Sequence, residues 1–357
     1  MKVCILGNGL TSLALAHSLV NQDIEVDIFE DKKIKKYDKI QTLAISKTNI
    51  DFFNKNILNI EKLVWNVHKI EIFSENLKDE KILSFKKNND QIFSMIRNFD
   101  LYNHLLVNLK KNKLINFRKK INYNKLIKID YKLIFNCDFQ NFITKKFFYK
   151  KIDKNYNSFA YITTFSHNKL LNNRIASQFF TKDGPLAFLP ISATETSVVY
   201  SVRGKKKIEL EDIIKKYNDK LKILKIEKII KFELKSTNLR SYYHDNIIAF
   251  GDLLHRLHPF AGQGFNMILR DIKEVFSLVK FNLELGLDFD KSFCYEFEKK
   301  TKNKNFIFSS GIDFIYEFFK IESKINNNVL SKSIKVLGKN KIVNSFFTKF
   351  ADNGIIL

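Results

Sequence analysis

The first thirty residues restrict the fold of this chain more than any other segment. Residues 2 to 6 are apolar enough for a short buried strand, residues 10 to 20 fit a helix, and residues 24 to 29 fit a second strand. Gly7 and Gly9 fall between the first strand and the helix. This order predicts a β-α-β unit in which a glycine turn leads from a strand into the N-terminus of a helix.

A glycine turn in this position has a specific chemical use. Gly7 permits a tight turn, and Gly9 lets the backbone approach a pyrophosphate held at the positive end of the helix. Ser12 stands where the usual pattern has a third glycine, and its small side chain still allows the helix to pack on the strand. Glu30 closes the second strand, where a carboxylate can accept hydrogen bonds from an adenosine ribose. The motif predicts a dinucleotide-binding turn, and an ordinary glycine turn is the alternative.

The later segments first extend this pattern and then change it. Residues 132 to 136 form another apolar stretch that could return to the same sheet. From 156 to 203 the chain is rich in Thr, Phe, Tyr and Val, which predicts an antiparallel sheet in a second domain. Residues 247 to 250 form one more strand, followed by a turn and a helix from 262 to 285. The remaining tail is expected to be helical and amphipathic.

The charge of the chain is strongly positive but dispersed. The sequence has 61 lysines and arginines, 38 acidic residues and a formal net charge of +23, yet only seven of the basic residues are arginines. Because arginine is the usual donor in bidentate contacts to phosphates and bases, this lysine excess argues against specific nucleic-acid binding. We interpret the charge as a solvated surface composition, with attraction to anionic lipid as the main functional alternative.

The cysteines and the hydropathy of the sequence indicate the cellular compartment and the kind of membrane contact to expect. The three cysteines, Cys4, Cys137 and Cys294, have no CxxC or His-paired spacing, so we expect neither disulfides nor a metal site, as in a reducing compartment. The first residues enter a strand at once, so we expect no secretion signal. No apolar run reaches the length of about eighteen residues that a membrane-spanning helix needs. Any membrane contact is therefore expected to be peripheral.

A second motif occupies residues 249–271, about 240 residues after the first. Gly251 and Asp252 end a strand, so the carboxylate is expected at the edge where sheets of this class bind ligands and where a flavin polyol chain could be held. Pro259 and the Gly-Gln-Gly run at 262–264 predict a rigid turn into a helix. The N–H groups at such a helix start can stabilise negative charge on a reduced flavin.

This segment resembles the Gly-Asp…His-Pro…Gly-Gln-Gly-x-Asn…Asp signature of group A FAD-dependent aromatic monooxygenases. Within that group it is most similar to the ubiquinone-biosynthesis hydroxylases, the 2-polyprenylphenol hydroxylase family. Residues 43–46, Trp65 and residues 183–190 also fall in the family's order. The resemblance spans nearly the whole chain and implies an α/β fold: a Rossmann-like FAD-binding domain, an inserted mixed β-sheet substrate domain and a helical C-terminal tail.

The resemblance and the alternation of segments together suggest where the domains divide. The discontinuous FAD-binding domain is expected at residues 1–60, 95–150 and 240–290. The substrate domain is expected at 61–94 and 151–239, and the helical C-terminal region at 291–357.

The resemblance also implies which residues meet the cofactor. The residues expected to bind FAD are Gly7, Gly9, Leu10, Thr11, Ser12, Glu30, Gln41, Asp138, Gly251, Asp252, Pro259, Gly262, Gln263, Gly264, Phe265 and Asn266. His258 and Pro259 are the candidates for a catalytic positioning role near the flavin. For His258, turn stabilisation and proton handling stay equal alternatives.

Three other polar or aromatic features have plainer interpretations. His255 is expected to stabilise its turn by a hydrogen bond. Asp271, on the helix after the motif, is expected to be solvated or to interact with the helix dipole. The aromatic tail at 306–319 is interpreted as core, with peripheral membrane attachment as the alternative.

The implied activity is hydroxylation of the aromatic ring of a polyprenylated phenol in ubiquinone biosynthesis. NADH or NADPH would reduce bound FAD, and dioxygen would supply the oxygen atom; the cofactor performs the redox chemistry, and the protein orients the ring and excludes water. The implied location is cytoplasmic, peripheral on the inner face of the cytoplasmic membrane, with a quinone-biosynthesis complex as a partner.

Three departures from the family pattern keep a non-enzymatic alternative open. Gln41 stands where the family usually has arginine, residues 138–142 replace Asp-Gly-x-x-Ser with Phe139 and Phe142 at the Gly and Ser positions, and Ile268 stands where glycine is common. The alternative is a flavin-binding, catalytically degenerate member that serves as a structural partner in a biosynthetic complex.

Two other enzyme classes fit less well. A nicotinamide dehydrogenase would explain residues 2–30 but not the second motif. Flavin halogenases carry a Trp-x-Trp-x-Ile-Pro element, which a chain with Trp65 as its single tryptophan does not have.

Overall fold

The computed structural model describes most of the chain. The described residues are 1–30, 38–75, 80–86, 91–119, 121–170, 172–204, 206, 208–218, 221–257 and 263–325, with the side chains of 315 and 318–325 excepted.

The glycine turn belongs to a six-stranded, mostly parallel sheet with the strand order β16-β17-β9-β1-β2-β8. Its strands are β1 (Lys2–Leu6), β2 (Glu25–Glu30), β8 (Ile115–Lys119), β9 (Leu133–Asn136), β16 (Tyr243–His244) and β17 (Ile247–Ala249). All neighbouring pairs are parallel except β16 with β17. Strands from three separated parts of the sequence therefore form one sheet, because each contributes a short run of buried apolar residues.

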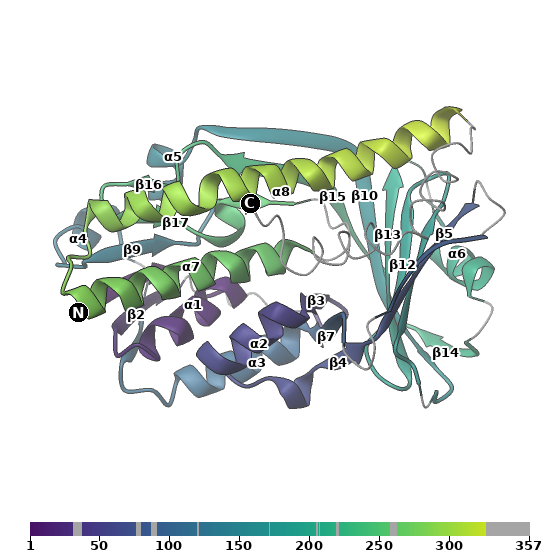
Figure 1. Cartoon of the computed structure of the whole chain (residues 1–357), viewed down its shortest axis with the longest axis horizontal. Coiled ribbons are helices and arrows are strands. Elements are labelled where there is room, and N and C mark those ends of the chain that lie inside the picture. Colours follow the sequence, from purple (N-terminus) through teal and green to yellow (C-terminus); the bar gives the residue numbers. More distant parts are fainter. Residues whose placement is uncertain are drawn as a thin grey trace.

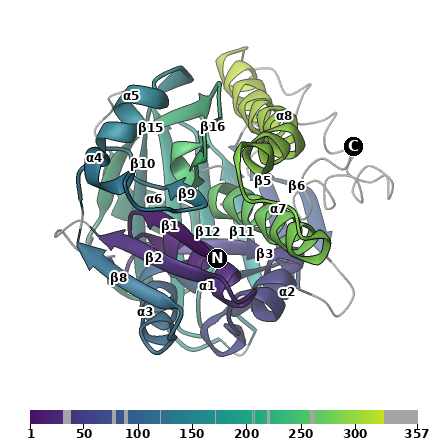
Figure 2. The same cartoon turned by 90° about the vertical axis from the view of Figure 1, so that its left-hand side faces the viewer.

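Helices cover both sides of this sheet (Figures 1 and 2). On one side, α1 (Leu10–Val20) packs between α3 (Asn98–Leu109) and α7 (Gln263–Leu285), and α2 (Lys47–Asn56) packs on α7. Figure 2 shows the short helices α4 (Tyr123–Leu126) and α5 (Phe142–Phe147) next to each other on the opposite side. This is the arrangement of layers that a β-α-β opening predicts.

A nine-stranded sheet forms the other half of the molecule. Its strands are β5 (Lys69–Ser74), β6 (Glu80–Lys86), β10 (Lys151–His167), β11 (Ile175–Phe180), β12 (Pro185–Pro190), β13 (Glu195–Arg203), β14 (Ile223–Ile226), β15 (Ile230–Leu239) and β18 (His255–Arg256), with α6 (Leu210–Tyr217) beside them. The expectation of an antiparallel sheet holds for β10, β12 and β13. The sheet as a whole is mixed, because β5 joins β11 in parallel.

A three-stranded sheet connects the two halves. It consists of β3 (Thr42–Ser46), β7 (Phe93–Arg97) and β4 (Trp65–Val67), preceded by the 3-10 turn η1 (Glu61–Leu63). The Thr42 hydroxyl donates a hydrogen bond of 3.0 Å to Ser197 Oγ on β13. The indole N–H of Trp65 donates to the backbone oxygen of Asn173, so Trp65 has a bonding role as well as a packing one.

The last described helix, α8 (Lys291–Ile325), runs along both large sheets (Figure 1). Its 35 residues correspond to roughly 50 Å. Near its start, the Glu298 carboxylate accepts a hydrogen bond from the backbone N–H of Tyr242. Near its other end, the Tyr316 hydroxyl is 2.8 Å from Ser158 Oγ on β10. The tail is therefore helical as expected, and Phe308, Ile312 and Tyr316 on it are buried.

No helix among the residues described has the length and apolar character that crossing a bilayer requires.

The α8 interface offers a test of which aromatic residues stabilise the fold. Phe297 is fully buried, and its ring lies 5.9 Å from that of Phe250, directly before the second glycine motif. Phe314 on the same helix is 69% exposed. We expect Phe297→Ala to lower the free energy of unfolding by about 3–5 kcal/mol through a buried cavity, and Phe314→Ala to change it by no more than about 0.5 kcal/mol.

Urea denaturation followed by circular dichroism measures both variants. Equal losses for the two would mean that α8 does not pack on the sheet in the way described.

Candidate functional site

The two glycine motifs meet at one edge of the six-stranded sheet. Leu6 at the end of β1 pairs with Asn136 on β9, and Asn136 pairs with Ala249 on β17. The three strands are parallel, so the residues that follow them, Gly7, Cys137 and Phe250, emerge side by side. This is the edge at which parallel sheets bind ligands.

The backbone conformation at position 7 favours glycine. Its φ is +107°, in the region that L side chains rarely adopt, and its N–H donates to the Phe29 oxygen at 3.0 Å. A Cβ at Gly7 would lie 3.5 Å from Ser12 Oγ and 3.6 Å from Cys137. Ser12 is fully buried beneath this turn, where only a small side chain fits.

The N-terminus of α1 faces the same edge without a side-chain cap. Gly9 is the capping residue in an extended conformation, no side chain caps it, and the first turn contains no acidic residue. The N–H groups of the first turn and the helix dipole therefore present positive charge at the sheet edge. An anionic group, such as a pyrophosphate, fits this place chemically.

Gly251 lies directly against the first turn of α1. Its φ is +68°, and a Cβ there would come 2.6 Å from Cγ2 of Thr11. The backbone of the second motif therefore approaches the first motif as closely as it can.

Burial raises the pKa of the Cys137 thiol to about 12, and the nearby charge of Asp252 contributes to this shift. Asp252 itself is exposed at this edge.

The start of α7 is held by a network around Asn266. Asn266 is buried; its Oδ1 accepts from the Ser46 N–H at 2.8 Å and from Asn49 Nδ2 at 2.9 Å, and its Nδ2 donates to the Ala44 oxygen at 2.8 Å. Asn266 thus ties α7 to the end of β3 and the start of α2. Contact of Asn266 with the cofactor stays a prediction, and Asn49 is a member of this network for which the sequence offers no signal.

The structure describes some of the remaining residues of the second motif but not others. Phe265 is buried, and Gln263 and Gly264 are half-buried at the start of α7. Within the described part of the chain, Gln263 Oε1 is a buried polar atom without a hydrogen-bond partner. His258, Pro259 and Gly262 lie outside the described residues.

The turn after β9 is shaped by a buried asparagine. Asn136 Oδ1 accepts from the Asp138 N–H at 3.2 Å and from Asn141 Nδ2 at 2.6 Å. Asp138 Oδ1 accepts from the N–H of Gln140. Phe139 and Phe142 are 45% and 58% exposed, so their rings point outward from this turn.

Glu30 and Gln41 come from different sheets. Glu30 is half-buried at the end of β2. Gln41 is half-buried just before β3, and its backbone oxygen accepts from the Asn98 N–H at 2.9 Å. Their contacts with a cofactor stay predictions.

The expectation that Asp271 is solvated is wrong. Asp271 is 1% exposed, and its carboxylate accepts hydrogen bonds from His255 Nε2 and from Asn305 Nδ2, the latter at 2.9 Å. α8 covers this face of α7, which the local sequence does not reveal. His255 is also buried, and its contact with Asp271 links the segment after Gly251 to α7, in line with the structural role expected for it.

Arg270 lies beside this pair and is itself half-buried. Its guanidinium lies 4.0 Å from the Phe308 ring centre, and its Nε donates to the Asn266 oxygen at 3.3 Å. Burial lowers its pKa to about 10, so it stays protonated at neutral pH.

No protein-family model matches the chain. Among curated proteins, the mitochondrial ubiquinone biosynthesis monooxygenase COQ6 of Schizosaccharomyces pombe is 22% identical over 276 residues, which cover 63% of this chain and 57% of that protein. The 3-demethoxyubiquinol 3-hydroxylase of Escherichia coli is 26% identical over 152 residues, 40% of this chain and 39% of that protein. The alignments thus span little more than half of the first relative's length and less of the second's.

Solved structures share the fold across nearly the whole chain. The p-nitrophenol 4-monooxygenase of Pseudomonas putida has a TM-score of 0.78 at 13% identity, covering 99% of this chain and 98% of that one. HpxO of Klebsiella pneumoniae, solved with FAD and uric acid, has a TM-score of 0.76 at 12% identity, covering 99% and 97%. The expected fold class is confirmed: a mixed α/β architecture with helices at the C-terminal end.

The contact of Gly251 with Thr11 can be tested by stability alone. Gly251→Ala adds both positive-φ strain and a steric conflict, whereas Gly286→Ala adds the strain only, because Gly286 has a φ of +65° and open space around its Cβ position. We expect Gly251→Ala to be more destabilising than Gly286→Ala by about 1–3 kcal/mol.

In Gly251→Ala/Thr11→Ser, which removes Cγ2 of Thr11, part of that difference should return. Chemical denaturation of the single and double variants measures this, and a double variant no more stable than Gly251→Ala would contradict the contact.

The buried Asp271 can be compared with a partly exposed carboxylate on the same helix, Glu274. Asp271→Ala leaves two buried donors unpaired, and we expect a loss of about 3–5 kcal/mol in the free energy of unfolding. Glu274 also joins α7 to α8, through Lys300 at 3.2 Å, but at the surface. For Glu274→Ala we expect a loss of at most about 1 kcal/mol. Similar losses in urea titrations of the two variants would refute a special role for the buried pair.

Proposed function

We propose that this chain, a relative of the ubiquinone-biosynthesis monooxygenases with the fold of FAD-dependent monooxygenases, binds FAD and hydroxylates the aromatic ring of a polyprenylated phenol in ubiquinone biosynthesis. One observation carries the proposal. The two motifs, about 240 residues apart, meet where Gly251 lies against Thr11, at the uncapped start of α1.

The residues at this edge fit the chemical groups of FAD. The N–H groups at the start of α1 suit the pyrophosphate, and Glu30 at the end of β2 suits the adenosine ribose. The exposed carboxylate of Asp252 suits the polyol chain. The start of α7, with the unpartnered oxygen of Gln263, suits the polar flavin ring.

Bound FAD would supply the redox chemistry with dioxygen, and NADH or NADPH would supply the electrons. The part of this chain's own residues is to bind, orient and exclude water. The backbone contact of Gly251 with α1 and the tether from Asn266 to Ala44 and Ser46 fix the starts of α1 and α7 relative to each other. Two positive helix ends are thereby held in place before any ligand arrives.

The proposed substrate class is supported by the names of the relatives and by an apolar cluster between two sheets. Ala44, Val67, Met95 and Ala176 form a buried apolar cluster between the three-stranded and nine-stranded sheets, and Trp65 packs against it. Ala44 in this cluster accepts a hydrogen bond from Asn266 at the start of α7, so an apolar region lies close to the helix start proposed to meet the flavin, as suits a hydrophobic ring substrate. We further propose a cytoplasmic location with peripheral membrane attachment, and association with other enzymes of quinone biosynthesis.

A second candidate is a flavin-binding structural partner without turnover. It is motivated by Gln41 and by Phe139 and Phe142, which stand where the resembled family has arginine, glycine and serine. The two proposals share FAD binding and differ in whether a nicotinamide reduces the flavin.

FAD binding is tested by adding a negative charge directly before the start of α1. Asn8→Asp introduces this charge, and the wild-type asparagine has the same bulk without charge. We expect the aspartate variant to bind FAD at least about tenfold more weakly than the wild type. Its stability should not be lower than that of the wild type, because an acidic residue favours a helix N-terminus. Flavin fluorescence titration gives the affinities, and equal affinities would exclude this binding mode.

Turnover is tested on the purified protein loaded with FAD. Bleaching of the flavin spectrum by NADH or NADPH, reoxidation by air and transfer of one labelled oxygen atom from dioxygen to a prenylated phenol would support the monooxygenase. A yellow protein that neither donor reduces would favour the structural partner. A protein that cannot be reconstituted with FAD would overturn both.

A further inference from the structure

We propose that the surface made by α4 and α5 docks on a membrane of anionic phospholipids. This α4–α5 face consists of exposed apolar residues and of lysines around them. Its members are Ile127, Phe142, Tyr149, Lys125, Lys128, Lys145, Lys146 and Lys150. The inference rests on the peripheral membrane attachment proposed above and names its surface, and it does not depend on the proposed hydroxylation.

The apolar residues of the α4–α5 face are exposed because other residues anchor the two helices. Leu126 on α4 and Ile143 on α5 are buried on the inner side. Asparagine side chains cap both helices, with Asn122 accepting from the Lys125 N–H and Asn141 from the Thr144 N–H.

The outward positions carry large apolar side chains in place of the polar ones usual on a solvated face. Ile127 is 54% exposed, Phe142 58% and Tyr149 61%. The ring of Phe142 lies beside Tyr123 on α4, and exposed apolar side chains gathered on one face mark interaction sites more often than plain surface.

The aromatic rings on this face form a packed platform. Tyr123 lies 6.0 Å from Phe142 and 5.8 Å from Phe147, measured between ring centres. The ammonium group of Lys146 is 5.0–5.7 Å from the centres of all three rings. Rings with a lysine amine over them suit the boundary between hydrocarbon and headgroups, where the amine can reach phosphates while the rings stay apolar.

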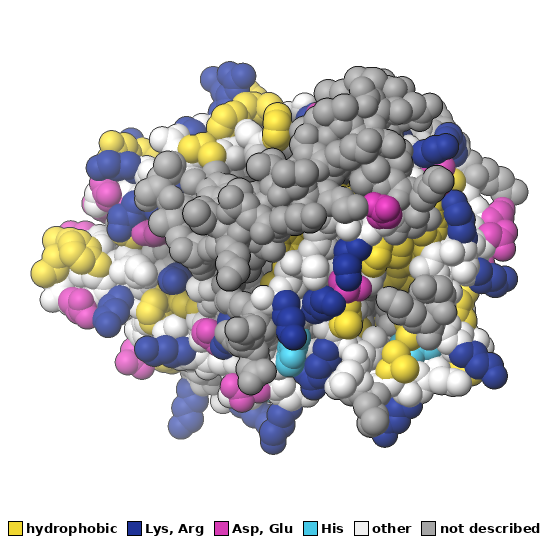
Figure 3. Space-filling view, turned by 45° about the vertical axis from the view of Figure 1, so that its right-hand side comes forward, with side chains coloured by type: hydrophobic (Ala, Val, Ile, Leu, Met, Phe, Trp, Pro, Cys, Tyr) yellow, Lys and Arg dark blue, Asp and Glu magenta, His cyan; other side chains and the backbone are white. Residues whose placement is uncertain are grey.

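The charge of this face is one-sided. Residues 123–150 contain six lysines and two acidic residues, Asp130 and Asp138. The five lysines of the α4–α5 face make no ion pair within the described residues. Elsewhere, as over much of Figure 3, Lys and Arg side chains lie among Asp and Glu. Positive charge in excess of the nearby carboxylates is attracted to an anionic leaflet.

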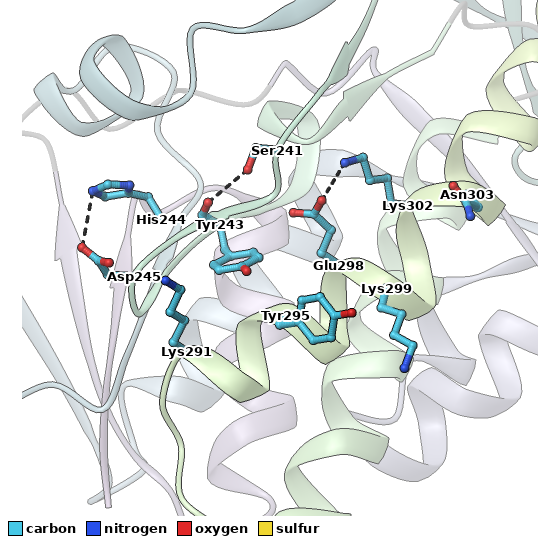
Figure 4. A pocket seen from close by; sticks show the side chains of 10 residues that line it. All are labelled: Ser241, Tyr243, His244, Asp245, Lys291, Tyr295, Glu298, Lys299, Lys302 and Asn303. Atoms are coloured by element: carbon cyan, nitrogen blue, oxygen red, sulfur yellow. Dashed lines mark hydrogen bonds and ion pairs between the residues drawn. The ribbon is translucent and has the colours of Figure 1, made fainter.

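A groove lies beside this face, between β16 and α8. The Phe147 ring stacks on His244 with 3.9 Å between ring centres, which joins α5 to β16. Next to His244 lies an open groove with a cavity volume of about 570 Å³. Figure 4 shows Tyr243 on the β16 side and Tyr295 on α8, with Lys299 and Lys302 projecting from α8. Glu298 is paired with Lys302 at 2.6 Å. Asp245 also lines the groove, so acidic and basic side chains are mixed there, and the one-sided charge belongs to the α4–α5 face.

A lipid surface fits these features better than an acidic protein or a nucleic acid. The aliphatic Ile127 and the ring of Phe142 offer no hydrogen bonds to a polar partner. No arginine occurs between Arg118 and Arg174, so the bidentate donors typical of nucleic-acid sites are missing from the sequence there. Apolar insertion combined with diffuse positive charge is the pattern of peripheral membrane binding.

The test is co-sedimentation of the purified chain with vesicles. Vesicles of phosphatidylcholine alone are compared with vesicles that also contain phosphatidylglycerol, at low and high salt. We expect binding to the anionic vesicles, which weakens as salt is added. No binding, or equal binding to both kinds of vesicle, would overturn the proposal.

Variants assign the binding to this face. Lys145→Glu/Lys146→Glu/Lys150→Glu should weaken partitioning onto anionic vesicles by at least about tenfold. The control, Lys215→Glu/Lys222→Glu/Lys225→Glu, makes the same change in net charge at exposed positions elsewhere. A loss as large in the control would mean that only net charge matters and would refute the assignment.

The apolar contribution is tested separately. Phe142→Ser should weaken binding several-fold, and Phe314→Ser, which changes another exposed phenylalanine, should not. Near-ultraviolet circular dichroism shows whether each variant is folded. If the wild type ignores vesicles but self-associates in light scattering, and Phe142→Ser abolishes this, the face is a protein interface and the lipid proposal is wrong.

Discussion

The close approach of Gly251 to Thr11 is the constraint on which the rest of the molecule depends. It can occur only if β1, β9 and β17 are adjacent and parallel, because only then do their ends emerge at one edge. That adjacency in turn requires the chain to return to the first sheet after forming all strands of the nine-stranded sheet except β18. The arrangement of the two large sheets is thus linked to a contact between one methyl group and one backbone carbon.

The α7–α8 pair keeps this arrangement in place from outside. His255 follows the contact by four residues, and its ring binds the buried Asp271, which Asn305 on α8 also binds. A buried carboxylate with two donors resists displacement, since losing either one leaves an unpaired polar group. Further along α8, Tyr316 reaches Ser158 on β10. One helix therefore relates the edge that holds Gly251 to the sheet of the other half.

The elements that could be predicted from the sequence are those determined by local pattern. The strands at 2–6 and 25–30 and the helix at 10–20 follow from short apolar runs and from the glycines between them. The buried partners of Asp271 could not be predicted, because α8 lies next to α7 only in the folded chain.

Asp27 shows the same limit. It is 1% exposed within β2, where Arg118 from β8 and Tyr131 bind its carboxylate, both at 2.5 Å. A single acidic residue in an apolar run looks like an exception until its partners, about 90 and 104 residues away, are known. Asn49 and Asn136 belong to the same class, since asparagine has no periodic signature.

The exposure of Phe139 and Phe142 changes the meaning of their departure from the family motif. Two large rings in place of glycine and serine would obstruct the nucleotide edge if they pointed into it. Both rings are instead exposed, and that of Phe142 lies 6.0 Å from the Tyr123 ring on α4, while Asn136 and Asn141 hold the turn from inside. The polar framework of the turn is thus intact while its outer surface is apolar. Phe139 and Phe142 therefore change which partners the outer surface of this turn can bind. The close contact of Gly251 with the start of α1 is present despite them.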